Sequence, residues 1–499
     1  MKTILFLMIF LLLMPYVTYG QDDAPAYTLD IVGGKDVTLE IDGATIDGIT
    51  VGTTFVRSTY PDGGMIFAAD ITSENGAVTE VKAIGSVPSG TTERGDAALD
   101  TETGQWVAEL FPASNNMLPW RDFEFQWRVT DESGEQILTD SVPLDYWDPT
   151  RQWYRLENDY MVMYWFGVDE VDPEYIARST TEVMQITEEM RRQAFGFELD
   201  YKPIAIVYGT RDATAETIGT PMLMSGLAGL TPGMTLQTFG ARDDAWFERQ
   251  ADCIHVTPRE EQTQQYLVDR AINSTIPHEI THLYQAETGV GGPNWWPEGQ
   301  ATYFTIGQGI YDIGANERIR QLAQYQDLNS LDGNSLGTLT FEKDGCYAVG
   351  YDAGTSFIDF LVENYGGLDA QRAIMESMES GMVLSEALEA VTGKTFLELE
   401  NEWRAIYGYR ALTPEDLDPA LRLTDAIAPV YVEGDVFDVP GPLPLALNRD
   451  PGPQALPAGA GCLAGTQVTV LRVGSIDGVN YYEVDCLGIT GWLPEEKIP

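Results

Sequence analysis

Basic residues are scarce in this chain. Lysine and arginine together number 29, against 77 aspartate and glutamate residues, which gives a formal net charge of −48. A surface with this surplus of negative charge repels nucleic acids and anionic membranes, so we expect neither as a partner. The acidic residues are spread along the sequence rather than gathered into a calcium-binding loop, which is typical of a highly solvated surface. Calcium binding and a saline habitat are the alternatives.

Long hydrophobic runs are absent after the first twenty residues, so we expect no membrane span. Those first residues follow a different pattern. Lys2 precedes the apolar run ILFLMIFLLLM, and small residues lie before Gln21. This order is typical of a secretory signal peptide, which we assign to residues 1–20. The sequence therefore predicts a secreted protein of the extracellular space or the cell envelope.

Cysteine is also rare, with four residues in the whole chain. In an exported protein an even number of cysteines predicts disulfides, here two. Cys462 and Cys486 fall in one C-terminal module and are expected to pair. A second disulfide between Cys253 and Cys346 is a hypothesis that rests on the even number.

Histidine is the scarcest chemically active residue, and two of its three copies lie in the string PHEITH. On a helix, His278 and His282 project from the same face and can share one metal ion. Glu279 is rotated by about 100° from His278, so it can reach a metal-bound water. The alternative is an ordinary solvated helix face. The apolar neighbours of the motif favour a buried helix, and Pro277 is expected in its first turn.

A carboxylate that can complete the site follows in the segment WWPEGQATYF. A catalytic zinc ion takes three protein ligands and keeps one position open for water, and Glu298 supplies the third ligand beside the two histidines. Thr302, one helical turn later, can donate a hydrogen bond to Glu298 or simply pack. The third histidine, His255, lies in the strand-like stretch ADCIHV. It either contacts the substrate or is structural.

These motifs resemble those of the gluzincin metallopeptidases, and in particular the peptidase MA-like domains of secreted bacterial proteins. The resemblance covers roughly residues 155–410 and implies that His278, His282 and Glu298 bind Zn²⁺ while Glu279 acts as the general base. The segment GYDAGTSFIDFL is similar to the YxxG helix of aminopeptidase N-type gluzincins. That similarity implies that Tyr351 stabilises the oxyanion, although a tyrosine packed in the core is the alternative.

One departure from the aminopeptidases bears on specificity. Nothing upstream of HEITH resembles the GAMEN segment with which those enzymes hold the free amino terminus of a substrate. The resemblance therefore favours an endopeptidase, or a peptidase of unassigned type, over an aminopeptidase.

The remaining chain predicts a multidomain protein. Short alternating runs make residues 21–150 an all-β sandwich that resembles immunoglobulin or fibronectin type III modules, with the alternate residues 123, 125, 127 and 129 on one face. A central α+β gluzincin metallopeptidase domain covers 155–410, with a long loop or an insertion near the cleft at 209–250. A linker at 411–440 precedes residues 441–499, which resemble a bacterial SH3-like domain. Such small β-barrels often bind cell-wall or peptide ligands.

The sequence thus predicts a secreted zinc metallopeptidase that acts on a peptide or protein substrate. The alternative is a binding protein of the envelope or extracellular space, built on a gluzincin core that is inactive or hydrolyses something other than peptides. Because His278, Glu279, His282 and Glu298 are all intact, we favour the enzyme.

Overall fold

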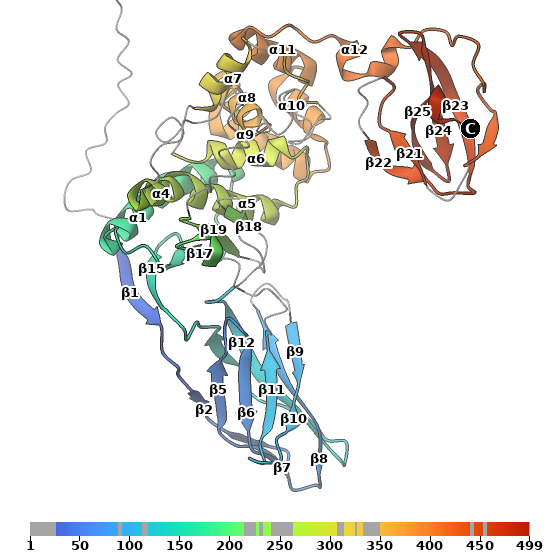
Figure 1. Ribbon diagram of the computed structural model, residues 1–499. Coiled ribbons are helices and arrows are strands. Elements are labelled where there is room, and N and C mark those ends of the chain that lie inside the picture. The colour runs from blue at the N-terminus through green and yellow to red at the C-terminus, as the bar shows by residue number, and fades with distance from the viewer. Residues whose placement is uncertain are drawn as a thin grey trace, which may run out of the picture. The chain divides into compact units, whose positions relative to one another are not determined.

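The computed structural model describes residues 26–87, 92–111, 118–213, 226–228, 233–240, 263–306, 314–324, 327–332, 350–439, 444–452 and 457–498. The chain divides into two compact units, and together they contain several β-sheets and many helices, as expected of a multidomain protein (Figure 1). The first unit holds the described residues up to 240 together with 263–287 and 304–306, and the second holds 288–303 and the described residues from 314 onward. None of the helices in the described ranges has the length and apolar character needed to cross a membrane.

The N-terminal part of the first unit consists of antiparallel sheets. One sheet has the strand order β10-β11-β6-β5-β2, a second has β13-β12-β8-β9 with β14 also paired to β12, and a small third has β3-β4-β7. The bounds are β2 Leu39–Ile41, β3 Ala44–Ile46, β4 Ile49–Val51, β5 Thr54–Ser58, β6 Met65–Ala69, β7 Ile71–Ser73, β8 Val78–Ser86, β9 Thr92–Asp96, β10 Ala98–Leu99, β11 Trp106–Leu110, β12 Asp122–Asp131, β13 Gln136–Leu138 and β14 Val142–Asp145.

The alternation in β12 is as predicted. Phe123, Phe125, Trp127 and Val129 are all buried, and the residues between them are exposed or partly exposed. The ring of Phe125 stacks on Phe67 of β6 with centroids 4.1 Å apart, which joins the two larger sheets through one apolar core. Burying alternate residues of each strand is what holds such sheets face to face.

The first strand departs from the sequence-based assignment. The run YTLDIVG was expected in the sandwich, but as β1 (Tyr27–Gly33) it pairs along its whole length with β15 (Gln152–Asn158). The pairing is antiparallel and runs from Tyr27 opposite Asn158 to Gly33 opposite Gln152. Strand alternation shows which face of a strand is apolar but not which strand is its partner. β1 therefore belongs to the central sheet.

The central sheet has six strands in the order β1-β15-β16-β17-β19-β18. Its remaining bounds are β16 Val162–Trp165, β17 Ile204–Tyr208, β18 Gly226–Ala228 and β19 Met234–Thr238. β16, β17 and β19 run parallel, and α1 (Pro173–Phe195) connects β16 to β17. The region 209–250 was expected to be a long loop or an insertion. The structure places β18 and β19 within it, at one end of the sheet, so a loop was the wrong expectation for these residues.

The histidine motif lies at the end of a longer helical segment than the sequence suggested. α4 (Gln264–Arg270) passes through a π-helical turn at Ala271–Thr275 directly into α5 (Ile276–Thr288). Pro277 lies in the first turn of α5, as expected, but the preceding π-helical turn makes α5 the continuation of a longer helical segment. Having no N–H, Pro277 cannot bond the carbonyl of Asn273 four residues back, and that carbonyl accepts a hydrogen bond from the Ile306 N–H instead, at 3.1 Å. The π turn and this replacement bond allow the proline.

The second unit is helical up to about residue 417. Its helices are α6 Trp295–Tyr303, α7 Ala315–Leu322, α8 Gly350–Asn364, α9 Gly367–Glu379, α10 Leu384–Thr392, α11 Phe396–Tyr407 and α12 Pro414–Leu417. α6 and α8 approach each other at two glycines. A Cβ added to Gly299 would lie 2.5 Å from the carbonyl carbon of Gly354, so neither position has room for a side chain. This contact brings the two helix backbones together.

A six-stranded antiparallel sheet follows, in the order β20-β23-β24-β25-β21-β22. Its bounds are β20 Val436–Asp438, β21 Leu445–Asn448, β22 Pro457–Cys462, β23 Gln467–Ile476, β24 Val479–Cys486 and β25 Ile489–Pro494. Cys462 and Cys486 form the disulfide that the sequence predicted. The part of this region that the structure describes shows no closure of the sheet into the expected barrel. An SH3-like identity for it remains a prediction.

A buried carboxyl group on α11 supports the segment that holds α6. Glu400 is fully buried and accepts hydrogen bonds from Ser330 Oγ at 2.7 Å and from the Leu331 N–H at 3.0 Å. The Leu331 carbonyl in turn accepts the indole N–H of Trp295 in α6, at 2.8 Å. Burial raises the pKa of Glu400 to about 7, although Arg404 lies 3.6 Å away.

This raised pKa predicts a specific dependence of stability on pH. The folded protein keeps Glu400 protonated up to about pH 7, whereas the unfolded chain ionises it near its ordinary pKa of 4.5. The contribution of Glu400 to the free energy of unfolding is therefore fully present below pH 4.5 and is lost as the pH rises through 7. Relative to Glu400→Gln, the wild type should lose unfolding free energy between pH 5 and 7 at up to about 1.4 kcal/mol per pH unit, measured by denaturant unfolding. Parallel curves of unfolding free energy against pH for the two proteins would contradict this expectation. Glu389→Gln, at an exposed position of α10, is the control.

Candidate metal centre

His278 and His282 lie one turn apart on α5, and both side chains are partly buried. Their Nε2 atoms are 3.2 Å apart, with the ring planes at 85° to each other. Two nitrogen ligands of a tetrahedral zinc ion at 2.0–2.1 Å are separated by about 3.3 Å, so the observed spacing fits such an ion. The helix therefore holds both nitrogens where the sequence predicted.

Gln285 is a further member of the site that the sequence analysis did not identify. Its Oε1 lies 2.7 Å from Nδ1 of His282, one turn back on the same helix. An amide oxygen accepts, so Nδ1 carries the proton and donates it, which leaves the lone pair of Nε2 for a metal. The i,i+3 spacing from His282 to Gln285 was visible in the sequence and could have indicated this contact.

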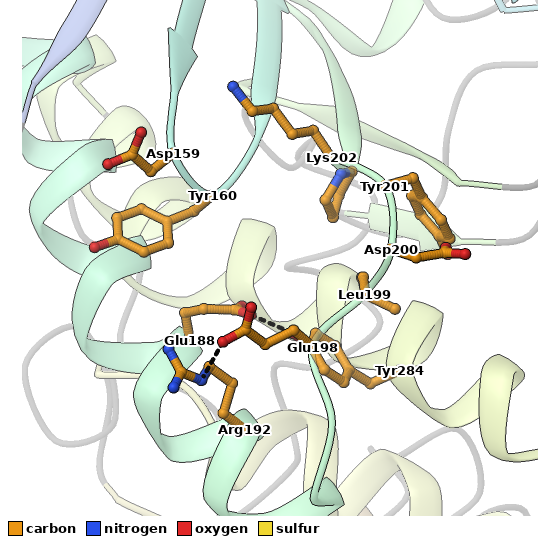
Figure 2. A pocket seen from close by; sticks show the side chains of 11 residues that line it. Asp159, Tyr160, Glu188, Arg192, Glu198, Leu199, Asp200, Tyr201, Lys202 and Tyr284 are labelled. Carbon is orange, nitrogen blue, oxygen red and sulfur yellow. Dashed lines mark hydrogen bonds and ion pairs between the residues drawn. The ribbon is translucent and has the colours of Figure 1, made fainter.

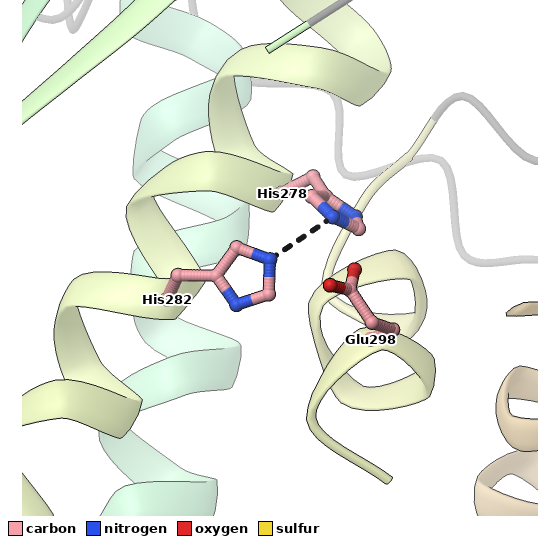
Figure 3. A group of neighbouring side chains, drawn as sticks. All are labelled: His278, His282 and Glu298. Carbon is pink, nitrogen blue, oxygen red and sulfur yellow. Dashed lines mark hydrogen bonds between the residues drawn. The ribbon is translucent and has the colours of Figure 1, made fainter. Parts of the chain in front are cut away.

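Glu298 comes from the first turn of α6. Trp295 and Trp296, just before it, are almost completely buried and anchor that turn. Thr302 donates its hydroxyl hydrogen to the backbone carbonyl of Glu298 at 2.9 Å, so its observed bond is to the backbone. Figure 3 shows the Glu298 carboxylate turned toward the two imidazoles.

The donor atoms of His278, His282 and Glu298 all lie within 4.8 Å of one another. Two imidazole nitrogens that face each other need a proton or a cation between them, because their lone pairs repel. The carboxylate adds negative charge to the same partly buried spot. Two imidazoles and one carboxylate are also a donor set that zinc prefers. The residues present therefore fit a zinc ion.

The side chain of Glu279 is buried against strand β18, whereas the neighbouring His278 is only partly buried. The Glu279 side chain is 6 % exposed, and the backbone of edge strand β18 lies against its carboxylate. A Cβ added to Gly226 would lie 2.3 Å from Oε1 of Glu279, so glycine at this position lets the strand backbone approach the carboxylate closely. The sequence did not identify Gly226, because the contact joins segments more than fifty residues apart.

Tyr351 occupies the first turn of α8 and is partly buried. Gly354, the glycine of the YxxG pattern, is the residue that meets Gly299 of α6, so the pattern has a packing explanation in addition to the functional one. Next to the tyrosine, Asp352 forms an ion pair of 2.9 Å with Arg318 of α7, and both side chains are mostly buried. The role of the Tyr351 hydroxyl remains a prediction.

Buried polar groups on α1 form hydrogen bonds with α5 at Pro277 and Tyr284. Arg191, which is fully buried, donates to the carbonyl of Pro277 at 3.3 Å and pairs with Glu188 at 3.1 Å. Tyr284 of α5 donates its hydroxyl hydrogen to the same Glu188, and burial together with that carboxylate raises the pKa of the tyrosine. These bonds fix the rotation of α5 about its axis, and thus the direction of its histidines.

A pocket of about 350 Å³ lies beside these groups, lined by α1, Tyr284 and the segment 198–203 (Figure 2). Arg192 and Glu198 in the wall of this pocket form an ion pair of 2.9 Å. Tyr284 and Glu188, which are hydrogen-bonded to each other, also line the pocket. Lys202, the other basic residue of the wall, pairs with Glu157 at 2.9 Å, so both basic groups are already bound by carboxylates. We assign the pocket to the support of α5 and not to substrate binding.

Three residues to which the sequence assigned a possible role lie outside the ranges that the structure describes: His255, Cys253 and Cys346. The proposed contact of His255 and the proposed Cys253–Cys346 disulfide therefore remain predictions.

No protein family matches the sequence, and no curated protein does so either. Two solved structures share 12 % sequence identity with the chain. Yeast LTA4 hydrolase in complex with bestatin matches with a TM-score of 0.27, covering 76 % of this chain and 70 % of its own. Legionella pneumophila aminopeptidase A in complex with aspartic acid matches with a TM-score of 0.30, covering 92 % of this chain and 47 % of its own. Likenesses this weak carry no argument, so the case for function rests on the residues above.

The Gln285 contact predicts an effect on metal affinity. Gln285→Ala removes the acceptor that fixes the tautomer and orientation of His282, so zinc affinity should fall roughly tenfold or more. Competition with a chromogenic chelator measures it. Gln321→Ala, which removes a glutamine from a surface pair on α7, should leave the affinity unchanged. Equal affinities for Gln285→Ala and the wild type would show that the contact does not position the ligand.

The contact between α6 and α8 predicts an effect on stability. Gly354→Ala inserts a methyl group against the backbone of α6 and should lower the unfolding free energy by about 1–3 kcal/mol. Gly291→Ala is the matched control, because nothing lies within 4 Å of its added Cβ and its backbone is not in the left-handed region. Similar denaturation midpoints for the two variants would contradict the close approach of the helices.

Proposed function

We propose that this protein is a secreted zinc-dependent metallopeptidase. The observation that carries the proposal is the convergence of two imidazoles and one carboxylate, with a fourth residue, Glu279, held in the turn between the histidines. His278, His282 and Glu298 would hold the zinc ion. An ordinary structural site would use a fourth protein ligand, whereas the three ligands found among the described residues leave a position for water.

Each residue has a defined chemical task in this proposal. Bound zinc supplies Lewis acidity and brings the pKa of a coordinated water towards about 7. The Glu279 carboxylate accepts the proton of the attacking water and returns it to the amine that leaves. Burial under β18 keeps this carboxylate away from bulk solvent. The Tyr351 hydroxyl donates a hydrogen bond to the oxyanion formed on the substrate carbonyl.

Two features support action outside the cytoplasm. The first twenty residues have the pattern of a secretory signal peptide, and the Cys462–Cys486 disulfide is the kind of bond that persists in an oxidising compartment. For the substrate we propose a peptide or protein cut internally, because the sequence lacks the aminopeptidase segment that holds a free amino terminus. The sheet at 436–494 could then hold a cell-wall or peptide ligand, as SH3-like domains do.

The role of Glu279 can be separated from metal binding. Glu279→Gln keeps the shape of the side chain but removes the base, so turnover should fall by roughly a hundred- to ten-thousand-fold while zinc remains bound. Activity is measured on a casein or peptide substrate, and zinc by elemental analysis of the same sample. Glu287→Gln on the exposed side of α5 is the control and should retain activity. Loss of zinc together with activity would contradict the assignment of Glu279 as a base.

The substrate class can be tested on a peptide library with free and with acetylated amino termini. Chelator-sensitive internal cleavage of both forms, read by mass spectrometry, supports an endopeptidase. Trimming of free termini alone would make the protein an aminopeptidase. Stoichiometric zinc with no cleavage of any peptide would favour the alternative, a binding protein or a hydrolase for other substrates.

A further inference from the structure

The N-terminal sandwich leaves one side of its core incompletely covered. In the described part of the chain, β2 pairs only with β5, and β14 pairs only with β12. A groove of about 540 Å³ lies between these two strands, which belong to different sheets. The strand that the sequence predicted at the start of this module, β1, is paired with β15 in the central sheet.

The groove is apolar where a strand would pack. Buried Phe125 and Trp127 line it, and Leu39 and Val142 contribute to its walls. Leu39 lies opposite buried Val56, and Val142 lies opposite buried Phe125, so both side chains project to the core face of their sheets. Leu39 is nevertheless 37 % exposed, and Val142 is partly exposed. Core-facing apolar residues at this edge thus retain contact with solvent.

One of the two strand edges is suited to pair with a further strand. An edge strand presents unpaired backbone N–H and C=O groups. β14 contains Pro143, which has no N–H to donate, and proline is a common means of blocking an edge. β2 has the sequence Leu-Glu-Ile and no such block. A strand that enters the groove would therefore pair with β2.

The charges around the groove are all negative. Glu40, Asp42 and Asp140 line it, and no lysine or arginine does so among the residues that the structure describes. Glu40 lies opposite exposed Phe55, on the other face of β2 from Leu39. Because successive side chains of a strand point to opposite faces, an added strand with apolar residues toward the groove would place its remaining residues beside Glu40. Basic residues fit at those positions.

We propose that this groove binds an extended segment of a partner protein by strand addition to β2, with alternating apolar and basic residues. The apolar side chains cover Leu39 and Val142, and the basic ones face Glu40, Asp42 and Asp140. Strand addition of this kind gains affinity from backbone hydrogen bonds and specificity from alternate side chains. A second copy of this chain fits poorly, because its net charge of −48 repels its own kind.

The test uses the full chain carrying Glu279→Gln, so that any peptidase activity does not consume the probe. The probe is an eight-residue peptide in which valine alternates with lysine, capped at both ends. Calorimetric titration should show saturable binding, and hydrogen exchange should show protection of the backbone amides of Leu39–Ile41. A peptide of the same sequence with every second backbone nitrogen methylated should not bind, because it cannot extend the ladder.

Two double variants separate the groove from general charge. Asp42→Lys with Asp140→Lys should weaken binding roughly tenfold, whereas Glu102→Lys with Glu135→Lys, on exposed turns elsewhere in the module, should change it little. Both doubles alter the net charge equally. The proposal is overturned if the peptide does not bind, if N-methylation leaves binding unchanged, or if the two doubles weaken binding equally. None of these results depends on zinc or on peptide cleavage.

Discussion

The 3.2 Å approach of two imidazole nitrogens, on His278 and His282, is the constraint on which the rest of the site depends. Two facing lone pairs repel each other unless a proton or a cation lies between them. The surrounding structure nevertheless holds them in place, since Gln285 fixes the second ring and Glu298 directs a carboxylate to the same spot. A metal ion is the simplest occupant that turns this repulsion into a stabilising interaction.

Holding the histidines in this way requires support from behind the helix. α5 is part of a continuous helical segment that tolerates Pro277 through a π turn, and the freed carbonyl of Asn273 accepts a hydrogen bond from Ile306. Arg191 and Glu188 on α1 bind the other side of α5 through the Pro277 carbonyl and Tyr284. π turns inside helices often occur at functional sites, where they rotate the residues that follow. Here the residues that follow are the histidine motif.

The sequence predicted best what depends on neighbouring residues. The spacing of the histidines and the alternation of β12 both follow from local periodicity, and each has the predicted form. Features that depend on distant partners were missed. The pairing of β1 with β15 and the contact of Gly226 with Glu279 join segments far apart in the chain, and alternation or a single glycine does not specify such partners. Gln285 is the exception, since it was within reach of helical spacing and was overlooked.

The central claim is that His278, His282 and Glu298 bind one zinc ion with a position open to water. X-ray absorption spectroscopy at the zinc edge on purified, metal-quantified protein tests it most directly. The account predicts about one zinc ion per chain, with two imidazole nitrogens at about 2.0–2.1 Å, oxygen ligands for the remainder and no sulfur. Zinc bound through sulfur, or a protein that retains no zinc at micromolar free metal, would contradict it.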